Sequence, residues 1–124
     1  MDYKQIARPW RIYNLFMIDW QTRLQAEFQR AEQARANRNE GQARVCARRA
    51  AGIAIREYFT RNGTVPPSTS AVDLLTLLKE DPLLSPDLKL IADHLTLRVN
   101  EEFKLPVDAD LVAEARQLCD ALLK

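Results

Sequence analysis

Apolar residues recur along the chain at steps of three and four, which is the period of an α-helix. The first stripe follows Pro9, a residue type that suits the first turn of a helix. Its members run as Trp10, Tyr13, Phe16, Trp20, Leu24, Phe28 and Ala31. Asn37, Asn39 and Gly41 then interrupt the pattern. We therefore expect one amphipathic helix from Pro9 to about Asn37.

A second helix is expected from Glu40 to Arg61. One of its faces carries small side chains, namely Ala43, Ala47, Ala50, Ala51 and Ala54. Small side chains let a neighbouring helix approach closely, so this segment should be the central helix of a bundle. Asn62-Gly63 favours a helix end, and Pro66 beyond it prevents the helix from continuing.

A short third helix is expected before Asp81-Pro82. Ser70 and Asp73 have the spacing of a capping box, in which each side chain satisfies a backbone N–H at the helix start. Leucines follow this cap as far as Leu78. The segment is long enough for about two helical turns.

Two further amphipathic segments complete the chain. Ser85 followed by Pro86 is typical of a helix start. The inward stripe of this fourth helix is Leu88, Ile91, Leu95 and Val99. We expect Asp108 to cap a last helix. Its inward residues are Leu111, Ala115, Leu118 and Leu122, with Val112 and Cys119 beside them.

No segment alternates with period two for long enough to form a strand. The pattern therefore predicts an all-α fold, an antiparallel up-and-down bundle of four to five helices. At 124 residues the chain suits one domain, because two separate cores would each be marginal. Residues 1–18 are either an aromatic N-terminal extension or the start of the first helix, and residues 19–123 form the bundle.

Charge is balanced overall but not along the chain. Residues 1–62 hold twelve Lys/Arg against six Asp/Glu, and residues 63–124 hold six against eleven, giving +6 and −5. Two faces of one bundle that attract each other, or a head-to-tail dimer, would explain this division. Alternatively, a basic strip on the second helix, formed by Arg44, Arg48, Arg49 and Arg56, would bind RNA or an acidic partner.

Candidate chemistry is sparse. Cys46 and Cys119 lack C-x-x-C spacing, and His94 is the only histidine, so we expect no metal, no disulfide and no cofactor. A structural or partly exposed histidine is the simpler interpretation of His94. No apolar run is long enough for a membrane span, and no secretory signal is evident, which favours a cytoplasmic protein that binds no membrane.

The second helix also resembles a known family. Residues 43–63 read ARVCARRAAGIAIREYFTRNG, which is similar to the central helix of HEPN domains (higher eukaryotes and prokaryotes nucleotide-binding). Asp19-Trp20 before a charged helix, a short leucine-rich helix after Pro66-Pro67 and a closing amphipathic helix match the family's plan over roughly residues 19–123.

The resemblance implies a helical bundle that is usually a homodimer. Members act beside a nucleotidyltransferase or, in other branches, as metal-independent RNase toxins of toxin–antitoxin pairs. The RNase branch uses an Arg-x4-6-His motif, whereas here Phe103 stands five residues after Arg98 and no histidine follows. Lys89 has the right spacing to His94 but the wrong chemistry, because lysine does not replace the arginine fork on a phosphate.

These observations lead us to expect a non-enzymatic HEPN-like module that forms a homodimer. It would bind a partner protein, such as a nucleotidyltransferase, or a nucleotide-bearing ligand. One alternative is a divergent RNase that uses Arg98 and His94, and another is a purely structural helical protein. The aromatic stretch from Tyr3 to Trp20 should contribute to the dimer contact, although it could instead fold back over its own bundle.

Overall fold

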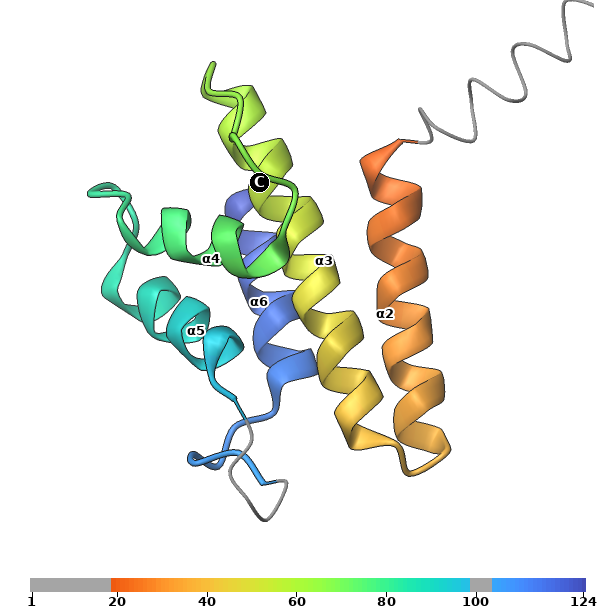
Figure 1. The fold of residues 1–124 in the computed structure, drawn as a ribbon. Coiled ribbons are helices and arrows are strands. Elements are labelled where there is room, and N and C mark those ends of the chain that lie inside the picture. The colour runs from red at the N-terminus through yellow and green to blue at the C-terminus, as the bar shows by residue number, and fades with distance from the viewer. Residues whose placement is uncertain (1–18, 99–103) are drawn as a thin grey trace, which may run out of the picture.

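A computed structural model describes residues 19–98 and 104–124, which contain five helices and no strand. The helices are α2 (Trp20–Ala36), α3 (Glu40–Arg61), α4 (Ala71–Lys79), α5 (Pro86–Thr96) and α6 (Leu111–Leu122) (Figure 1). The predicted all-helical bundle is confirmed. No helix in the described ranges is both long and apolar enough to cross a membrane.

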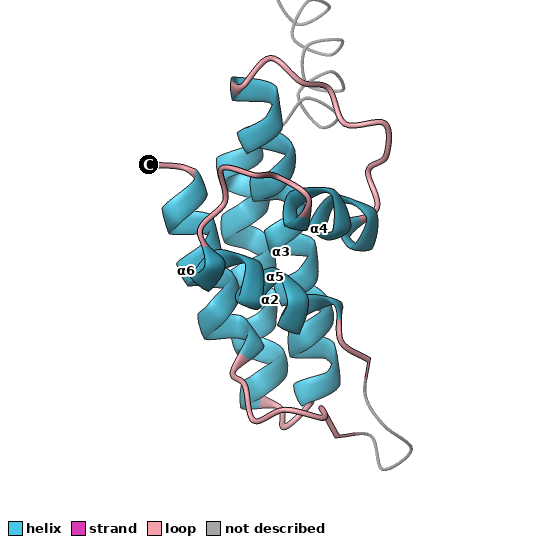
Figure 2. Cartoon of the chain, turned by 90° about the vertical axis from the view of Figure 1, so that its left-hand side faces the viewer, coloured by secondary structure: helices cyan, strands magenta, loops and turns pink. Residues whose placement is uncertain are grey.

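Helix α3 is the centre of the fold, as its small-residue face predicted. Its packing partners are α2, α4 and α6. Each of the five alanines of that face is fully buried, so neighbouring helices approach the α3 backbone closely. The leucine-rich faces of α4, α5 and α6 supply the larger core side chains. The two views show α4 lying across α3 rather than alongside it (Figures 1 and 2).

Helix α6 runs parallel to α3. Asp110, before α6, binds Arg35 next to the start of α3, while Arg61, at the end of α3, donates a hydrogen bond to the carbonyl of Leu123. The chain returns through α4 and α5, which explains the shared direction. Helix α2 packs almost entirely against α3, so the side of the bundle between α2 and α6 remains open.

Several predicted helix ends differ from those observed. Asp19 has an extended backbone (ψ 152°), and its carboxylate accepts a hydrogen bond from the backbone N–H of Thr22 at 2.8 Å. It is therefore an N-cap, and α2 begins at Trp20, whereas the sequence predicted one helix running from Pro9 through Trp20. The cap of α6 is likewise Asp110 and not Asp108, because only Asp110 accepts from the N–H of Ala113.

The two short helices show smaller differences. Ser70 caps α4 as predicted, but the Asp73 carboxylate accepts from the hydroxyl of Ser68 at 2.8 Å, so the capping box is not reciprocal. Helix α5 ends at Thr96, which leaves Arg98 beyond the helix that was expected to contain it. Residues 1–18 and Val99, which belonged to predicted stripes, lie outside the described residues.

Candidate anion-binding groove

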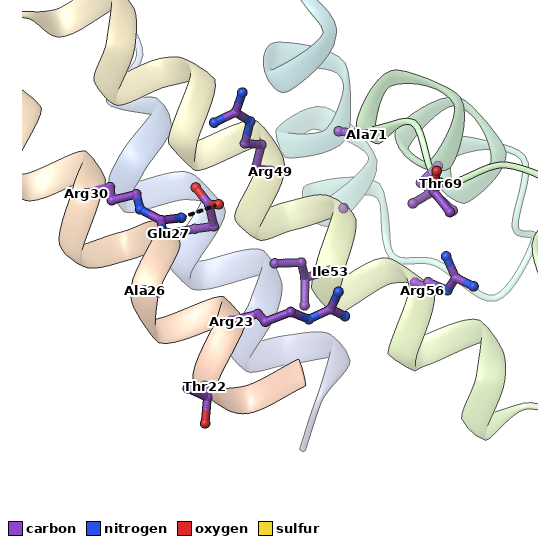
Figure 3. Close-up of a pocket in the computed structure, with 12 residues that line it drawn as sticks. Thr22, Arg23, Ala26, Glu27, Arg30, Arg49, Ile53, Arg56, Thr69 and Ala71 are labelled. Atoms are coloured by element: carbon purple, nitrogen blue, oxygen red, sulfur yellow. Dashed lines mark hydrogen bonds and ion pairs between the residues drawn. The ribbon is translucent and has the colours of Figure 1, made fainter. Parts of the chain in front are cut away.

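A groove of about 770 Å³ runs between α2 and α3 and reaches the segment that leads into α4 (Figure 3). Helix α2 contributes Thr22, Arg23, Ala26, Glu27 and Arg30; α3 contributes Arg49, Gly52, Ile53 and Arg56; the α4 side contributes Thr69, Ala71 and Leu74. We call it the arginine groove. Its floor is apolar, whereas guanidinium groups stand on both long sides.

The four arginines are arranged by helix geometry. Arg23 and Arg30 are seven positions apart on α2, as are Arg49 and Arg56 on α3, and seven residues make about two turns or 10 Å along a helix. Because α2 and α3 are antiparallel, Arg30 and Arg49 lie toward one end of the groove, and Arg23 and Arg56 toward the other (Figure 3).

Glu27 is the single acidic residue of the lining, and it lies at the Arg30 end. The residue is 9% exposed, and Oε1 accepts a hydrogen bond from Arg30 at 2.9 Å. The other oxygen, Oε2, is buried and has no hydrogen-bond partner among the described residues. A buried carboxylate oxygen without a donor is costly, and Arg30 is the only charged group that compensates Glu27 among the described residues.

The groove concentrates positive charge. Four arginines against one glutamate give a net charge of +3, while the whole chain carries +1. The rest of the chain is therefore net −2. Positive groups along low-dielectric walls attract anions, and the planar guanidinium fork matches two oxygens of a phosphate.

The structure divides the basic strip that the sequence suggested. Arg49 and Arg56 line the groove, but neither Arg44 nor Arg48 does. At about 100° per residue, Arg44 lies roughly 120–140° around α3 from Arg49 and Arg56. The four side chains therefore do not form one surface.

Arg48 has an internal role. Its Nε donates to the carbonyl of Leu95 at 2.8 Å, and its Nη2 donates to that of Leu97 at 2.9 Å. These carbonyls close α5, whose last C=O groups have no partner inside the helix. Burial, with a smaller effect from the positive charge of Arg44, lowers the pKa of Arg48.

The candidate RNase pair lies elsewhere. His94 Nδ1 is 2.8 Å from Oε1 and 3.2 Å from Oε2 of Glu114, so the imidazole joins α5 to α6. Arg98 is exposed, and no hydrogen bond or ion pair links it to His94 within the described part of the chain. Lys89 is five positions from His94 on α5, which places the two on different sides of that helix.

Both cysteines are free and buried in separate helices. Desolvation raises the pKa of Cys119 to about 12, so its thiol stays protonated near neutral pH. Among residues 19–98 and 104–124, no cluster of His, Cys, Asp and Glu side chains could hold a metal ion.

Sequence reasoning missed half of the groove. It considered the arginines of α3 alone, although Arg23 and Arg30 stand at the same seven-residue spacing on α2, with Glu27 between them on the same face. This repeated spacing on consecutive helices was the available signal. Comparisons with protein-family models, curated proteins and solved structures give no match to this chain.

Proposed function

We propose that the protein is a non-enzymatic, HEPN-like helical module of the cytoplasm, which dimerises and binds a nucleotide-bearing ligand or the partner protein that carries one. The observation that carries this proposal is the arginine groove, where four guanidinium groups face one carboxylate. A nucleotide offers phosphates to the arginines and an apolar base face to the floor around Ile53.

Glu27 makes the two ends of the groove different. The Arg30–Arg49 end carries a compensating carboxylate, whereas the Arg23–Arg56 end carries none in the lining. Phosphates should therefore bind near Arg23 and Arg56.

The composition of the groove supports binding rather than catalysis. Arginine remains protonated in proteins, so the four arginines position an anion without exchanging protons. Oε1 of Glu27 is already held by Arg30. A partner such as a nucleotidyltransferase would present its nucleotide to the same positive walls.

Titration of fluorescent ATP and of a fluorescent single-stranded RNA into the purified full chain tests the proposal. Replacing Arg23 or Arg56 by alanine should weaken binding about tenfold or more, because a hydrogen bond to a charged group contributes about 1.5–3 kcal/mol. Arg44→Ala is the matched control on α3, since Arg44 lies outside the groove.

Glu27→Gln should strengthen phosphate binding, because it removes the negative charge of the groove while keeping an oxygen for Arg30. Absence of saturable binding to both probes would contradict the proposed ligand class. Equal losses from Arg56→Ala and Arg44→Ala would contradict the groove as its site.

A further inference from the structure

A second groove, of about 560 Å³, lies on the other side of α2, between α2 and α6. Its apolar and sulfur-bearing residues are Trp20, Leu24, Phe28 and Cys119, and its rim is polar, formed by Gln21, Gln25, Gln29, Glu32, Arg116 and Asp120. We call it the α2–α6 groove. It shares no residue with the arginine groove, so the two surfaces can be tested separately.

The α2–α6 groove is where the bundle is incomplete. Helices α2 and α6 both pack on α3, while contacts between α2 and α6 are few. Trp20 and Leu24 are only partly buried. Two guanidinium groups lie over aromatic rings of the lining: Arg116 is 4.4 Å from the centroid of the buried Phe28, and Arg61 is 5.3 Å from that of the partly buried Trp20. One additional segment placed there would contact both α2 and α6 and fill the space between them.

We propose that residues 1–18 of a second copy of this chain occupy the α2–α6 groove. This proposal rests on the homodimer proposed above and identifies the surface through which the two copies bind. Eighteen residues precede Asp19, and the chain enters α2 at Trp20, which also lines the groove. This length holds four aromatic residues, Tyr3, Trp10, Tyr13 and Phe16. These residues carry three basic side chains against one acid, and the rim offers them Asp120, which forms no ion pair with a described residue, whereas Glu32 is already paired with Arg116.

A second copy fits better than the chain's own segment. Asp19 is the N-cap of α2, so a segment folding back on its own groove must reverse direction immediately before it. Loops that join antiparallel helices take about 2–5 residues, which would remove Phe16 and its neighbours from the contact. A segment from a second copy needs no reversal, and a two-fold pair fills both grooves.

Sedimentation equilibrium at micromolar concentrations tests this surface on full-length chains. The unmodified chain should be a dimer, and the triple variant Trp10→Ser, Tyr13→Ser, Phe16→Ser should be a monomer of unchanged helicity. Leu24→Asp, in the groove, should also dissociate the dimer. The matched controls change exposed apolar residues elsewhere, Val72→Asp on α4 and the triple serine variant of Val65, Leu83 and Leu90, and should remain dimeric.

Cross-linking identifies the occupant. A chain carrying Tyr13→Cys is mixed with a chain carrying Gln25→Cys and oxidised, so that only contact between copies can join these positions. A Tyr13→Cys to Gln25→Cys disulfide, mapped by mass spectrometry, is expected. Its absence, together with a dimer that survives the aromatic triple variant, would overturn the proposed surface and leave the dimer standing. A monomeric unmodified chain would overturn both.

Discussion

At the scale of single residues, Arg48 and Arg49 are neighbours in sequence with different roles. Arg48 is half-buried and holds two backbone carbonyls at the end of α5, whereas Arg49 is exposed in the arginine groove. Arg48→Ala leaves those carbonyls without their charged donor, so we expect it to lower the free energy of unfolding by about 1.5–3 kcal/mol.

Arg49→Ala is the matched control for that change. Substitution of an exposed side chain away from structural contacts usually changes stability by less than about 0.5 kcal/mol. Urea denaturation of both variants measures the difference. Equal stability of the two would show that the Arg48 contacts do not support the α5 end, while Arg49→Ala should still weaken ligand binding.

At the scale of elements, the contact between α3 and α4 depends on Gly52. A Cβ built on Gly52 would lie 3.2 Å from both Cα and Cβ of Ala71, which is in the rigid first turn of α4. Alanine is favoured over glycine within a helix by about 1 kcal/mol, but overpacking a core contact costs about 1–3 kcal/mol. We therefore expect Gly52→Ala to destabilise the protein.

Gly41→Ala provides the opposite case. Gly41 is in the first turn of α3, is exposed, and an added Cβ would meet only Asn39 Oδ1 at 3.9 Å. This substitution should stabilise the protein by about 0.4–1 kcal/mol. Thermal unfolding of the two variants should shift in opposite directions, and a stabilising Gly52→Ala would show that α4 moves aside without cost.

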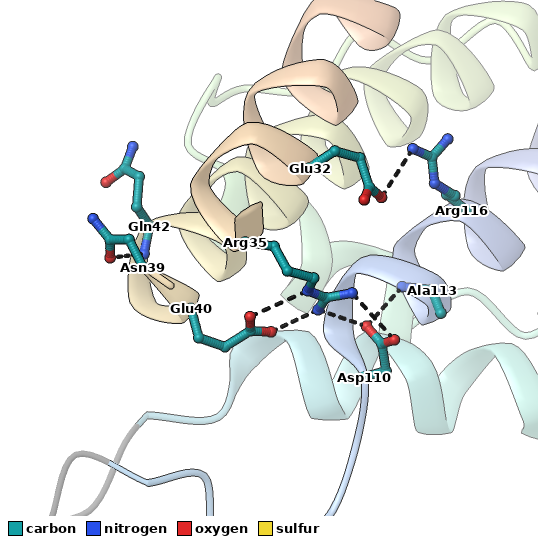
Figure 4. A network of polar contacts seen from close by, with 8 residues as sticks. All are labelled: Glu32, Arg35, Asn39, Glu40, Gln42, Asp110, Ala113 and Arg116. Atoms are coloured by element: carbon teal, nitrogen blue, oxygen red, sulfur yellow. Dashed lines mark hydrogen bonds and ion pairs between the residues drawn. The ribbon is translucent and has the colours of Figure 1, made fainter. Parts of the chain in front are cut away.

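At the scale of the whole molecule, two separate sets of ion pairs join the first half of the chain to the second. Arg35 of α2 binds Glu40 of α3 at 2.6 Å and Asp110 at 2.9 Å, while Glu32 of α2 is 3.4 Å from Arg116 of α6 (Figure 4). The hydrogen bond to Glu40, and to a smaller extent the one to Asp110, raises the pKa of Arg35. In return, the hydrogen bond from Arg35 lowers the pKa of Asp110 below 3.8.

Asp110→Asn tests the Arg35 ion pairs across pH. Asparagine keeps the helix cap but not the charge, so at pH 7 we expect a loss of at most about 1 kcal/mol. Because folding lowers the pKa of Asp110, the unfolded chain binds more protons below pH 3.8, and the original stability falls as the pH drops through the folded pKa. At acid pH the free energies of unfolding of Asp110→Asn and of the original protein should therefore become equal.

Chemical denaturation at a series of pH values from 7 into the acid range measures that convergence. Asp108→Asn is the control, because Asp108 is exposed and makes no ion pair with any residue that the structure describes. A constant difference between Asp110→Asn and the original protein at all pH values would attribute the effect to the cap instead of the charge.

The sequence alone determined most of the elements. The bounds of α3 were predicted correctly because strong local signals, Asn39 before it and Asn62-Gly63 after it, act through local backbone preferences. The inward faces of α3 and α6 were also predicted correctly, because helical periodicity alone selects them. Local signals were ambiguous where two acids compete for one cap, as Asp108 and Asp110 do.

Only the tertiary structure decided which charged residues share a surface. Periodicity shows which face of a helix is polar, but not which neighbour lies beside it. The repeated spacing of arginines on α2 and α3 therefore did not show that Arg23 and Arg30 share a groove with Arg49 and Arg56. For the same reason, the hydrogen bonds of Arg48 to α5 and of His94 to Glu114 were not predicted, because the paired residues are 47 and 20 positions apart in the sequence. Such contacts depend on how the helices pack, and packing is set by the core as a whole.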